Sequence, residues 1–324
     1  MQRERDPKNS ACQKHSISPQ LKTKPRKCAI QLKERGFLTS GTSKSLRYEI
    51  IFASSEKIYP EDVPPESVKL VVTSPPYWDL KDYEVPGQIG RGDPNYSSYL
   101  ARIEVVWEQV YSALAPDGIF CLNANTKFDG RAGALQLIPW DLATAALRAG
   151  FFLRDFLLWH KSTAIPRHDR DLKDNFEWVF LLTKTNEPLA YYGASEVTFL
   201  DYVINPPPVR SNPNMWNLNK KAGSVGIPGV RHPAIFHEDL PGRMIDLFTR
   251  PGDLVLDPFL GSGTTLAEAF RRGRACVGYE INNEDFWIYM REKFQKVLPA
   301  NLLIQALPSD SVSPERAILT LSED

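Results

Sequence analysis

The chain has 324 residues, of which 42% are hydrophobic and 24% charged, the proportions of an ordinary globular protein in water. It contains no apolar run long enough to cross a bilayer, which excludes a membrane-embedded protein. Its 39 basic and 39 acidic residues cancel, so a protein that coats nucleic acid through its overall charge is also excluded, and any such contact must come from local patches.

The charge is uneven at the N-terminus, where residues 1–35 hold ten Lys or Arg against three Asp or Glu. We expect residues 1–45 to form a basic, disordered tail rather than a DNA-gripping arm or a nuclear-import signal. Residues 301–324 are expected to form a second loose tail. The four cysteines and five histidines show no metal-ligand spacing, so the sequence predicts no metal site and a reducing compartment.

The first predicted element is a buried strand over Val68–Val72, which ends where a pair of prolines begins. Either Ser97 or Ser98 is the expected N-cap of the next helix, whose apolar stripe runs from Leu100 to Leu114. We expect Pro116-Asp117-Gly118 to end that helix.

Strands and helices then alternate, as a doubly wound α/β sheet requires. The predicted strands are Gly118–Asn123, Phe152–Trp159, Phe176–Leu182, Leu254–Leu256 and Ala275–Tyr279. The predicted helices are Leu137–Arg148, Leu240–Thr249, Thr264–Arg272 and Glu284–Val297. Residues 189–231 are rich in Pro, Asn and Gly, and a loop of this length is usually functional or disordered. The sequence therefore predicts an α/β fold with a mostly parallel sheet and one insertion.

A glycine turn, Asp257-Pro-Phe-Leu-Gly-Ser-Gly-Thr-Thr265, lies between a predicted strand and a predicted helix. Gly261 and Gly263 allow a tight turn, and the free N–H groups of the following helix attract a carboxylate or phosphate. Glu280 follows Asp257 by 23 residues, near the spacing at which an acid binds ribose hydroxyls in dinucleotide folds. A phosphate loop and an NAD site are the alternatives, but the glycine spacing of both is absent.

The second motif is Thr73-Ser74-Pro75-Pro76-Tyr77-Trp78, directly after the strand at Val68–Val72. Alone it is also compatible with an ordinary turn or a polyproline ligand. Followed by the glycine turn, it resembles the β group, the circularly permuted arrangement, of the amino-methylating DNA methyltransferases. The resemblance runs from about Val68 to Asn283. It implies a Rossmann-like fold and S-adenosylmethionine as the cofactor. It places the cofactor contacts at Asp257, Phe259, Gly261, Gly263, Thr264 and Glu280.

The resemblance makes Ser74, Pro75, Pro76 and Tyr77 the catalytic loop. An exocyclic amino nitrogen is a poor nucleophile, and acceptors such as the Ser74 hydroxyl and the Pro75 carbonyl can draw its lone pair back from the ring. The target base must first be flipped out of the duplex, and Tyr77 is expected to stack on it. Trp78 forms a second wall or packs in the core, and Asp79 and Asn123 are expected near the same network.

In the family resembled, Ser at the first motif position points to cytosine N4 and Asp or Asn to adenine N6. We therefore predict an N4-cytosine DNA methyltransferase that acts on a specific double-stranded sequence. The alternatives are N6-adenine methylation by the same machinery, a non-catalytic DNA-binding module that retains the fold, and methylation of RNA or protein. Methylation at carbon 5 is set aside because no structured Pro-Cys-Gln is present.

Residues 189–231 fall where this family carries its target-recognition region. Met215 and Trp216 are candidates for an apolar wedge that fills the gap left by the flipped base. The candidate phosphate contacts are Arg210, Lys220, Lys221 and Arg231, and a flexible surface loop is the alternative for each of them. His160-Lys161 resembles a family element near the substrate pocket.

Two departures from the family pattern concern the cofactor side. An acidic Gly-Asp pair usually precedes the catalytic strand, but this chain has Ala53-Ser54-Ser55-Glu56. In the stretch after His232-Pro233, His237 stands where relatives often have proline.

The expected organisation is thus a catalytic half over 46–188, a target-recognition insertion over 189–231 and a cofactor half over 232–300. The expected partners are double-stranded DNA and, as a candidate, a cognate restriction endonuclease, with no membrane. In a bacterium the expected location is the cytoplasm at the nucleoid, and in a eukaryote the nucleus.

Overall fold

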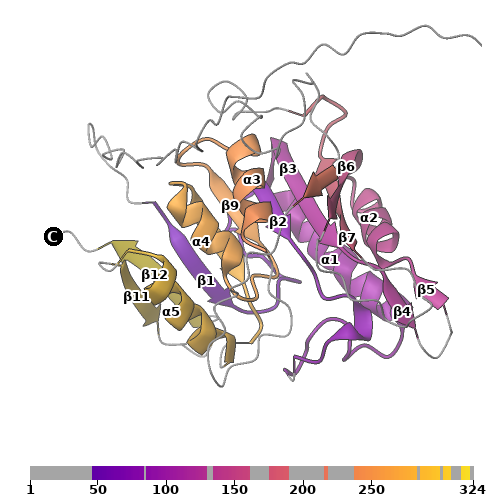
Figure 1. The fold of residues 1–324 in the computed structure, drawn as a ribbon, viewed down its shortest axis with the longest axis horizontal. Helices are drawn as coiled ribbons and strands as arrows, with labels where there is room; N and C mark the ends of the chain where they lie inside the picture. Colours follow the sequence, from indigo (N-terminus) through magenta and orange to yellow (C-terminus); the bar gives the residue numbers. More distant parts are fainter. Residues whose placement is uncertain are drawn as a thin grey trace, which may run out of the picture. The chain divides into compact units, whose positions relative to one another are not determined.

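A ten-stranded sheet in the order β11-β12-β1-β10-β9-β2-β3-β7-β6-β8 forms the centre of the computed structural model (Figure 1). The structure describes residues 46–83, 85–129, 134–160, 175–189, 215–217, 237–282, 285–299, 302–307 and 315–321. The predicted basic tail, residues 1–45, lies outside the described residues.

The strands of this sheet are β1 (Tyr48–Phe52), β2 (Val68–Thr73), β3 (Leu114–Ala124), β6 (Phe152–His160), β7 (Phe176–Thr183), β8 (Met215–Asn217), β9 (Leu254–Asp257), β10 (Ala275–Tyr279), β11 (Leu302–Leu307) and β12 (Glu315–Leu321). A separate hairpin consists of β4 (Lys127–Asp129) and β5 (Ala134–Gln136). The helices are α1 (Tyr96–Ala113), α2 (Ile138–Arg148), α3 (Asp239–Phe248), α4 (Thr264–Arg271) and α5 (Asp285–Val297), with a 3₁₀ turn over Trp78–Leu80.

The middle of the sheet is parallel. β1, β10, β9, β2 and β3 each pair in parallel with the next, while β7 and β12 are antiparallel to their neighbours. The predicted α/β fold with a doubly wound, mostly parallel sheet is therefore confirmed. β2 and β9 are neighbours in register, with Val71 opposite Leu256, so the loops that follow both strands emerge at the same edge of the sheet.

Hydrophobic cores on both faces of the sheet explain the continuous apolar run in β2. Leu70 and Val72 belong to the core that also contains Met244 of α3. Val71 belongs to the opposite core, which includes Trp107 of α1. The first core also contains residues of α4, and the second contains residues of α2, so α3 and α4 cover one face of the sheet and α1 and α2 cover the other (Figure 1).

The boundaries of α1 differ from the prediction. Asn95 is the N-cap, and its side-chain oxygen accepts a hydrogen bond from the Ser98 backbone N–H at 2.9 Å, so neither Ser97 nor Ser98 caps the helix. The helix ends at Ala113, and β3 begins at the next residue, because Leu114 already pairs with Val68. The predicted helix terminator, residues 116–118, lies inside β3.

The predicted loose C-terminal tail is wrong for much of its length, because β11 and β12 form an antiparallel hairpin that extends the sheet beside β1. The prediction failed because the contacts of this hairpin are with residues far away in sequence. Arg316 of β12 lies 2.6 Å from Asp62 and 3.3 Å from Glu49, two carboxylates that are buried near the other end of the chain. Local composition cannot reveal such partners.

Part of the predicted insertion is also regular. Met215–Asn217 forms β8, which pairs in parallel with the end of β6, and the rest of residues 190–231 lies outside the described residues. Among the described helices, none has the length and apolar content needed to cross a bilayer.

Candidate active site

The ends of β2 and β9 bring the two sequence motifs together. The Thr73 hydroxyl at the end of β2 donates a 2.7 Å hydrogen bond to the Asp257 carboxylate at the end of β9. Both residues are buried, at 0% and 3% exposure. The catalytic loop and the glycine turn therefore start from one hydrogen-bonded pair of strand ends.

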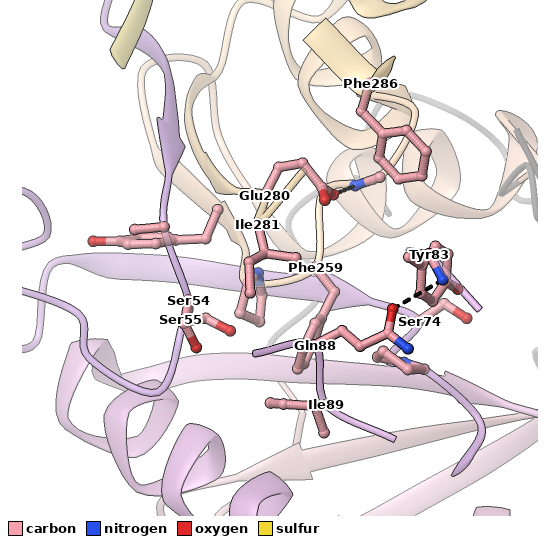
Figure 2. Close-up of a pocket in the computed structure, with 15 residues that line it drawn as sticks. Ser54, Ser55, Ser74, Tyr83, Gln88, Ile89, Phe259, Glu280, Ile281 and Phe286 are labelled. Atoms are coloured by element: carbon pink, nitrogen blue, oxygen red, sulfur yellow. Dashed lines mark hydrogen bonds between the residues drawn. The ribbon is translucent and has the colours of Figure 1, made fainter. Parts of the chain in front are cut away.

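A pocket beside this junction encloses about 630 Å³ of empty space, part of which is open to solvent. It is lined by Ala53, Ser54, Ser55, Ser74, Pro76, Tyr83, Gln88, Ile89, Pro258, Phe259, Gly261, Tyr279, Glu280, Ile281 and Phe286. Figure 2 shows Ser54 and Ser55 on one side of the pocket and Ser74 with Tyr83 on the opposite side. Among the residues that the structure describes, no group of acidic, His or Cys side chains could hold a metal ion.

Glu280 holds the glycine turn against the pocket. Its carboxylate accepts hydrogen bonds from the backbone N–H groups of Gly261 at 2.8 Å and Asn282 at 2.9 Å, and the first of these is drawn in Figure 2. Burial raises the pKa of Glu280 to about 7, although the bonds from Asn282 and Gly261 oppose that rise. Because it also lines the pocket, this carboxylate can accept a hydrogen bond from a ligand hydroxyl.

Asp257 is buried and does not line the pocket. Its carboxylate accepts from the hydroxyls of Thr73 and Thr265, each at 2.7 Å, and from the Phe259 N–H at 3.1 Å. Burial raises its pKa to about 6, against the effect of those same bonds. Asp257 therefore connects the catalytic loop and the glycine turn through hydrogen bonds. The predicted direct contact between Asp257 and the cofactor stays a prediction.

Gly263 and Thr264 form the back of the turn rather than its pocket face. Gly263 has a φ of +71°, and a Cβ there would lie 2.6 Å from the Phe294 ring, so packing as well as conformation requires glycine. The Thr264 hydroxyl accepts a 2.8 Å hydrogen bond from Lys293, which also donates to the Ser262 carbonyl at 3.1 Å. Burial lowers the pKa of Lys293 to about 8. Sequence reasoning missed this lysine, which no motif marks.

The catalytic loop is held in an extended turn by two tyrosines. The Ser74 and Tyr77 hydroxyls are 2.7 Å apart, and the Tyr99 hydroxyl donates a 2.7 Å hydrogen bond to the Pro76 carbonyl. Burial raises the pKa of Tyr77 well above its usual value, so this phenol is neutral at physiological pH. Ser74 and Pro76 reach the pocket, whereas Pro75 is buried behind them.

Trp78 packs against α1, with its ring 5.6 Å from that of Tyr96 and 5.5 Å from that of Tyr99. Its φ is +53°, unusual for a bulky residue, and a Cβ on Gly90 would lie 2.3 Å from its carbonyl oxygen. Of the two predicted roles, the structure favours packing. Asn123 is buried as well, and its amide donates to the Trp178 carbonyl at 3.2 Å.

The predicted DNA contacts divide into three groups. Trp216 is 7% exposed in the core that contains Trp159, so the proposed wedge into DNA is wrong for this residue, while Met215 beside it is 54% exposed. His160 ends β6. Lys161, Arg210, Lys220, Lys221 and Arg231 lie outside the described residues.

The sequence revealed one wall of the pocket only in part. Ser54 and Ser55, in the turn after β1, belong to a segment that the sequence resemblance placed on the cofactor side, whereas Gln88 and Ile89, in the loop after the catalytic motif, were not predicted. The sequence signal for these two residues was a glycine on either side, Gly87 and Gly90. In the structure both glycines have a positive φ, and the two residues between them are buried.

Comparisons with known proteins identify the family. The family model N6_N4_Mtase, described as DNA methylase, matches residues 68–291. The chain belongs to this DNA methylase family. It is 30% identical over 287 residues to the Type II methyltransferase M.XycI of Xanthomonas campestris pv. cyanopsidis, which covers 76% of this chain and 90% of that relative.

Solved structures agree with the fold of this DNA methylase. A putative DNA modification methylase from Thermus thermophilus, solved in complex with S-adenosyl-L-methionine, has a TM-score of 0.57 and 25% identity. The match covers 77% of this chain and 95% of that one. The PvuII DNA methyltransferase, which is described as cytosine-N4-specific, gives a TM-score of 0.58 at 24% identity, and the match covers 73% of this chain and 83% of that one.

The protein is thus an S-adenosylmethionine-dependent DNA methyltransferase of the N6/N4 family, with the Rossmann-like fold of that family. The pocket fits this cofactor. Glu280 offers a buried acceptor for hydroxyl groups, and Phe259, Ile281 and Phe286 offer apolar surface for an aromatic ring.

Proposed function

We propose that this methyltransferase modifies the exocyclic N4 of cytosine in a specific double-stranded DNA sequence, with the target base flipped out of the duplex. The observation that supports it most is the shared pocket, which Ser74 of the catalytic loop and Gly261 and Glu280 of the glycine turn all line. Serine at the first position of the catalytic motif favours cytosine, and the structurally similar PvuII methyltransferase is described as cytosine-N4-specific.

Ser74 supplies the acceptor that activates the target nitrogen. If its hydroxyl proton is donated to the neutral Tyr77 phenol, 2.7 Å away, both lone pairs of the Ser74 oxygen are available to the amino protons. The Pro75 carbonyl is the proposed second acceptor, while Tyr99 fixes the loop through the Pro76 carbonyl. Together the two acceptors withdraw the amino lone pair from the ring and leave it free to attack.

The bound S-adenosylmethionine supplies an electrophilic methyl group on its sulfonium. We propose that Glu280 accepts hydrogen bonds from the ribose hydroxyls and that Phe259 and Ile281 contact the adenine. The turn at Gly261 brings backbone N–H groups close to the ligand. Ser74 faces the same pocket from the side opposite Ser54 and Ser55, and it would hold the target nitrogen toward the methyl group of a bound cofactor.

Flipping the base out of the duplex costs about a few kcal/mol in lost stacking, and stacking of the flipped base on the Tyr77 ring partly offsets this cost. Contacts with the DNA backbone are proposed for the insertion and for the segment after His160. The Type II designation of the relatives supports a cognate restriction endonuclease as a proposed partner. The proposed location is inside the cell, where the DNA is.

The experiment is expression in a host without DNA methylation, followed by digestion of its DNA to nucleosides and mass spectrometry. N4-methylcytosine is the expected product. If N6-methyladenine were the only product, the target base would be adenine and not cytosine. Ser74→Ala should remove the product and retain cofactor binding, whereas Ser97→Ala, on the exposed side of α1, should change neither. If RNA or a protein competed better than DNA for the enzyme, the DNA substrate would be wrong.

A further inference from the structure

Arg102 of α1 ties together two loops that line the pocket, although it does not line the pocket itself. The first is the loop after the catalytic motif. One terminal nitrogen of Arg102 donates to the Gly87 carbonyl at 2.8 Å, and the other donates to the Gln88 carbonyl at 3.0 Å. The same guanidinium lies 3.1 Å from Asp93, whose other oxygen accepts from the Gly90 N–H at 2.7 Å.

The second loop is the turn after β1. Arg102 binds Glu56 through two parallel hydrogen bonds of 2.8 and 2.6 Å, the fork geometry that only arginine provides. Glu56 in turn accepts a 2.9 Å hydrogen bond from the Ser54 hydroxyl, which is itself at the pocket. The bonds from Arg102 lower the pKa of Glu56, so this carboxylate is ionised.

At the pocket the two loops form one wall. Gln88 is 6% exposed, and its side-chain oxygen accepts from the Tyr83 N–H at 2.9 Å, as Figure 2 shows. Figure 2 shows Gln88 and Ile89 between Ser54 with Ser55 on one side and Ser74 with Tyr83 on the other, so the two loops adjoin at the pocket. Because the methyl donor must face Ser74, the side bearing Ser54 and Ser55 receives the nucleoside end of the cofactor. This step rests on the function proposed above.

We propose that Arg102 is a positioning residue that sets the spacing of this wall and thereby the affinity for the nucleoside part of S-adenosylmethionine. Its role needs the whole guanidinium, since five hydrogen bonds reach four residues, Glu56, Gly87, Gln88 and Asp93. A lysine has three donors on a single nitrogen and cannot span them. Because Arg102 does not line the pocket, we expect the transfer step itself not to depend on it.

The test is steady-state methylation with purified full-length Arg102→Ala and Arg102→Lys. Both should raise the KM for S-adenosylmethionine about tenfold or more, with kcat at saturating cofactor within about threefold and the KM for DNA unchanged. The matched control is Arg148→Ala, which removes another arginine paired with α1, at 2.8 Å from Glu104, away from the pocket. Isothermal titration with S-adenosylmethionine gives the same comparison without turnover.

An unchanged cofactor KM in both variants would overturn the proposal, and so would a lower kcat at an unchanged cofactor KM. If Arg102→Ala unfolds at the assay temperature, Glu56→Gln keeps the arginine and the side-chain shape while it weakens the fork. A raised cofactor KM with kcat retained would then support the role of Arg102, and a wild-type KM would refute it. A wild-type enzyme that binds no S-adenosylmethionine would instead refute the proposed function.

Discussion

Replacement of Glu280 by Gln tests whether an ionised carboxylate in the pocket controls cofactor affinity. With a pKa of about 7, Glu280 would be about one tenth ionised at pH 6 and about nine tenths ionised at pH 8 in the empty enzyme. If only the carboxylate form receives the ribose hydroxyls, the apparent affinity scales with that fraction. Cofactor affinity should therefore rise about tenfold from pH 6 to pH 8.

Stability should change in the opposite direction. A folded-state pKa raised from 4.5 to about 7 means that protonated Glu280 contributes stability that is fully present below pH 4.5 and lost as the pH rises through 7. The loss is roughly 3 kcal/mol at about 1.4 kcal/mol per pKa unit. Glu280→Gln removes this dependence but turns an amide donor toward a backbone N–H, at a cost of about 1–3 kcal/mol.

Isothermal titration of S-adenosylmethionine into both proteins at several pH values measures the affinities. The variant is the internal control, since Lys293 and the cofactor's own amine also titrate in it. The expected variant binds more weakly and with a flatter pH dependence. An equal slope in the two proteins, or a wild type whose affinity does not change with pH, would refute the assignment of Glu280.

Three further substitutions address the loops. Tyr77→Phe removes the 2.7 Å partner of the motif serine and should lower kcat about fivefold, for a net hydrogen bond of about 1 kcal/mol, in a radiolabelled methyl-transfer assay; an unaltered kcat would contradict this. Thr73→Val removes the donor to a buried carboxylate and should cost about 1.5–3 kcal/mol in urea unfolding, and a smaller loss would mean that the junction is unimportant. Gly90→Ala places a Cβ 2.3 Å from the Trp78 carbonyl and should lower the melting temperature more than Gly252→Ala, which has a positive φ but no neighbour within 4 Å; equal losses would argue against the contact.

The sequence predicted the central fold because its strands are buried on both faces and its turns carry glycine or proline. It did not predict β1, whose run Tyr48-Glu49-Ile50-Ile51-Phe52 has a charged residue at its second position. Glu49 is 3% exposed, and it is stabilised there by Arg47 and by Arg316 of β12. Arg47 is a neighbour in sequence, but Arg316 is 267 residues away in the chain, so local sequence does not reveal that two arginines hold this buried carboxylate.

The site was predictable where a motif combines backbone geometry with chemistry, as at Ser74 and Gly261. It was not predictable where the wall of the pocket depends on loops that only the fold brings together, as at Gln88 and Ile89. Trp216 illustrates the opposite error: a large aromatic side chain in a polar stretch suggested an exposed wedge, and a short pairing with β6 places it in the core instead.

The hydrogen bond between Thr73 and Asp257 joins residues separated by 184 positions, and this separation has a consequence for biosynthesis. While a ribosome makes the chain, β2 and its loop are complete long before β9 exists to pair with them. The growing polypeptide must therefore carry an unpaired, apolar strand edge through most of translation, a state prone to aggregation. Pairing of β9 and then of β10 with the strands already made closes the sheet and brings the glycine turn beside the catalytic loop, so a fragment that ends before β9 contains the catalytic loop but no complete pocket.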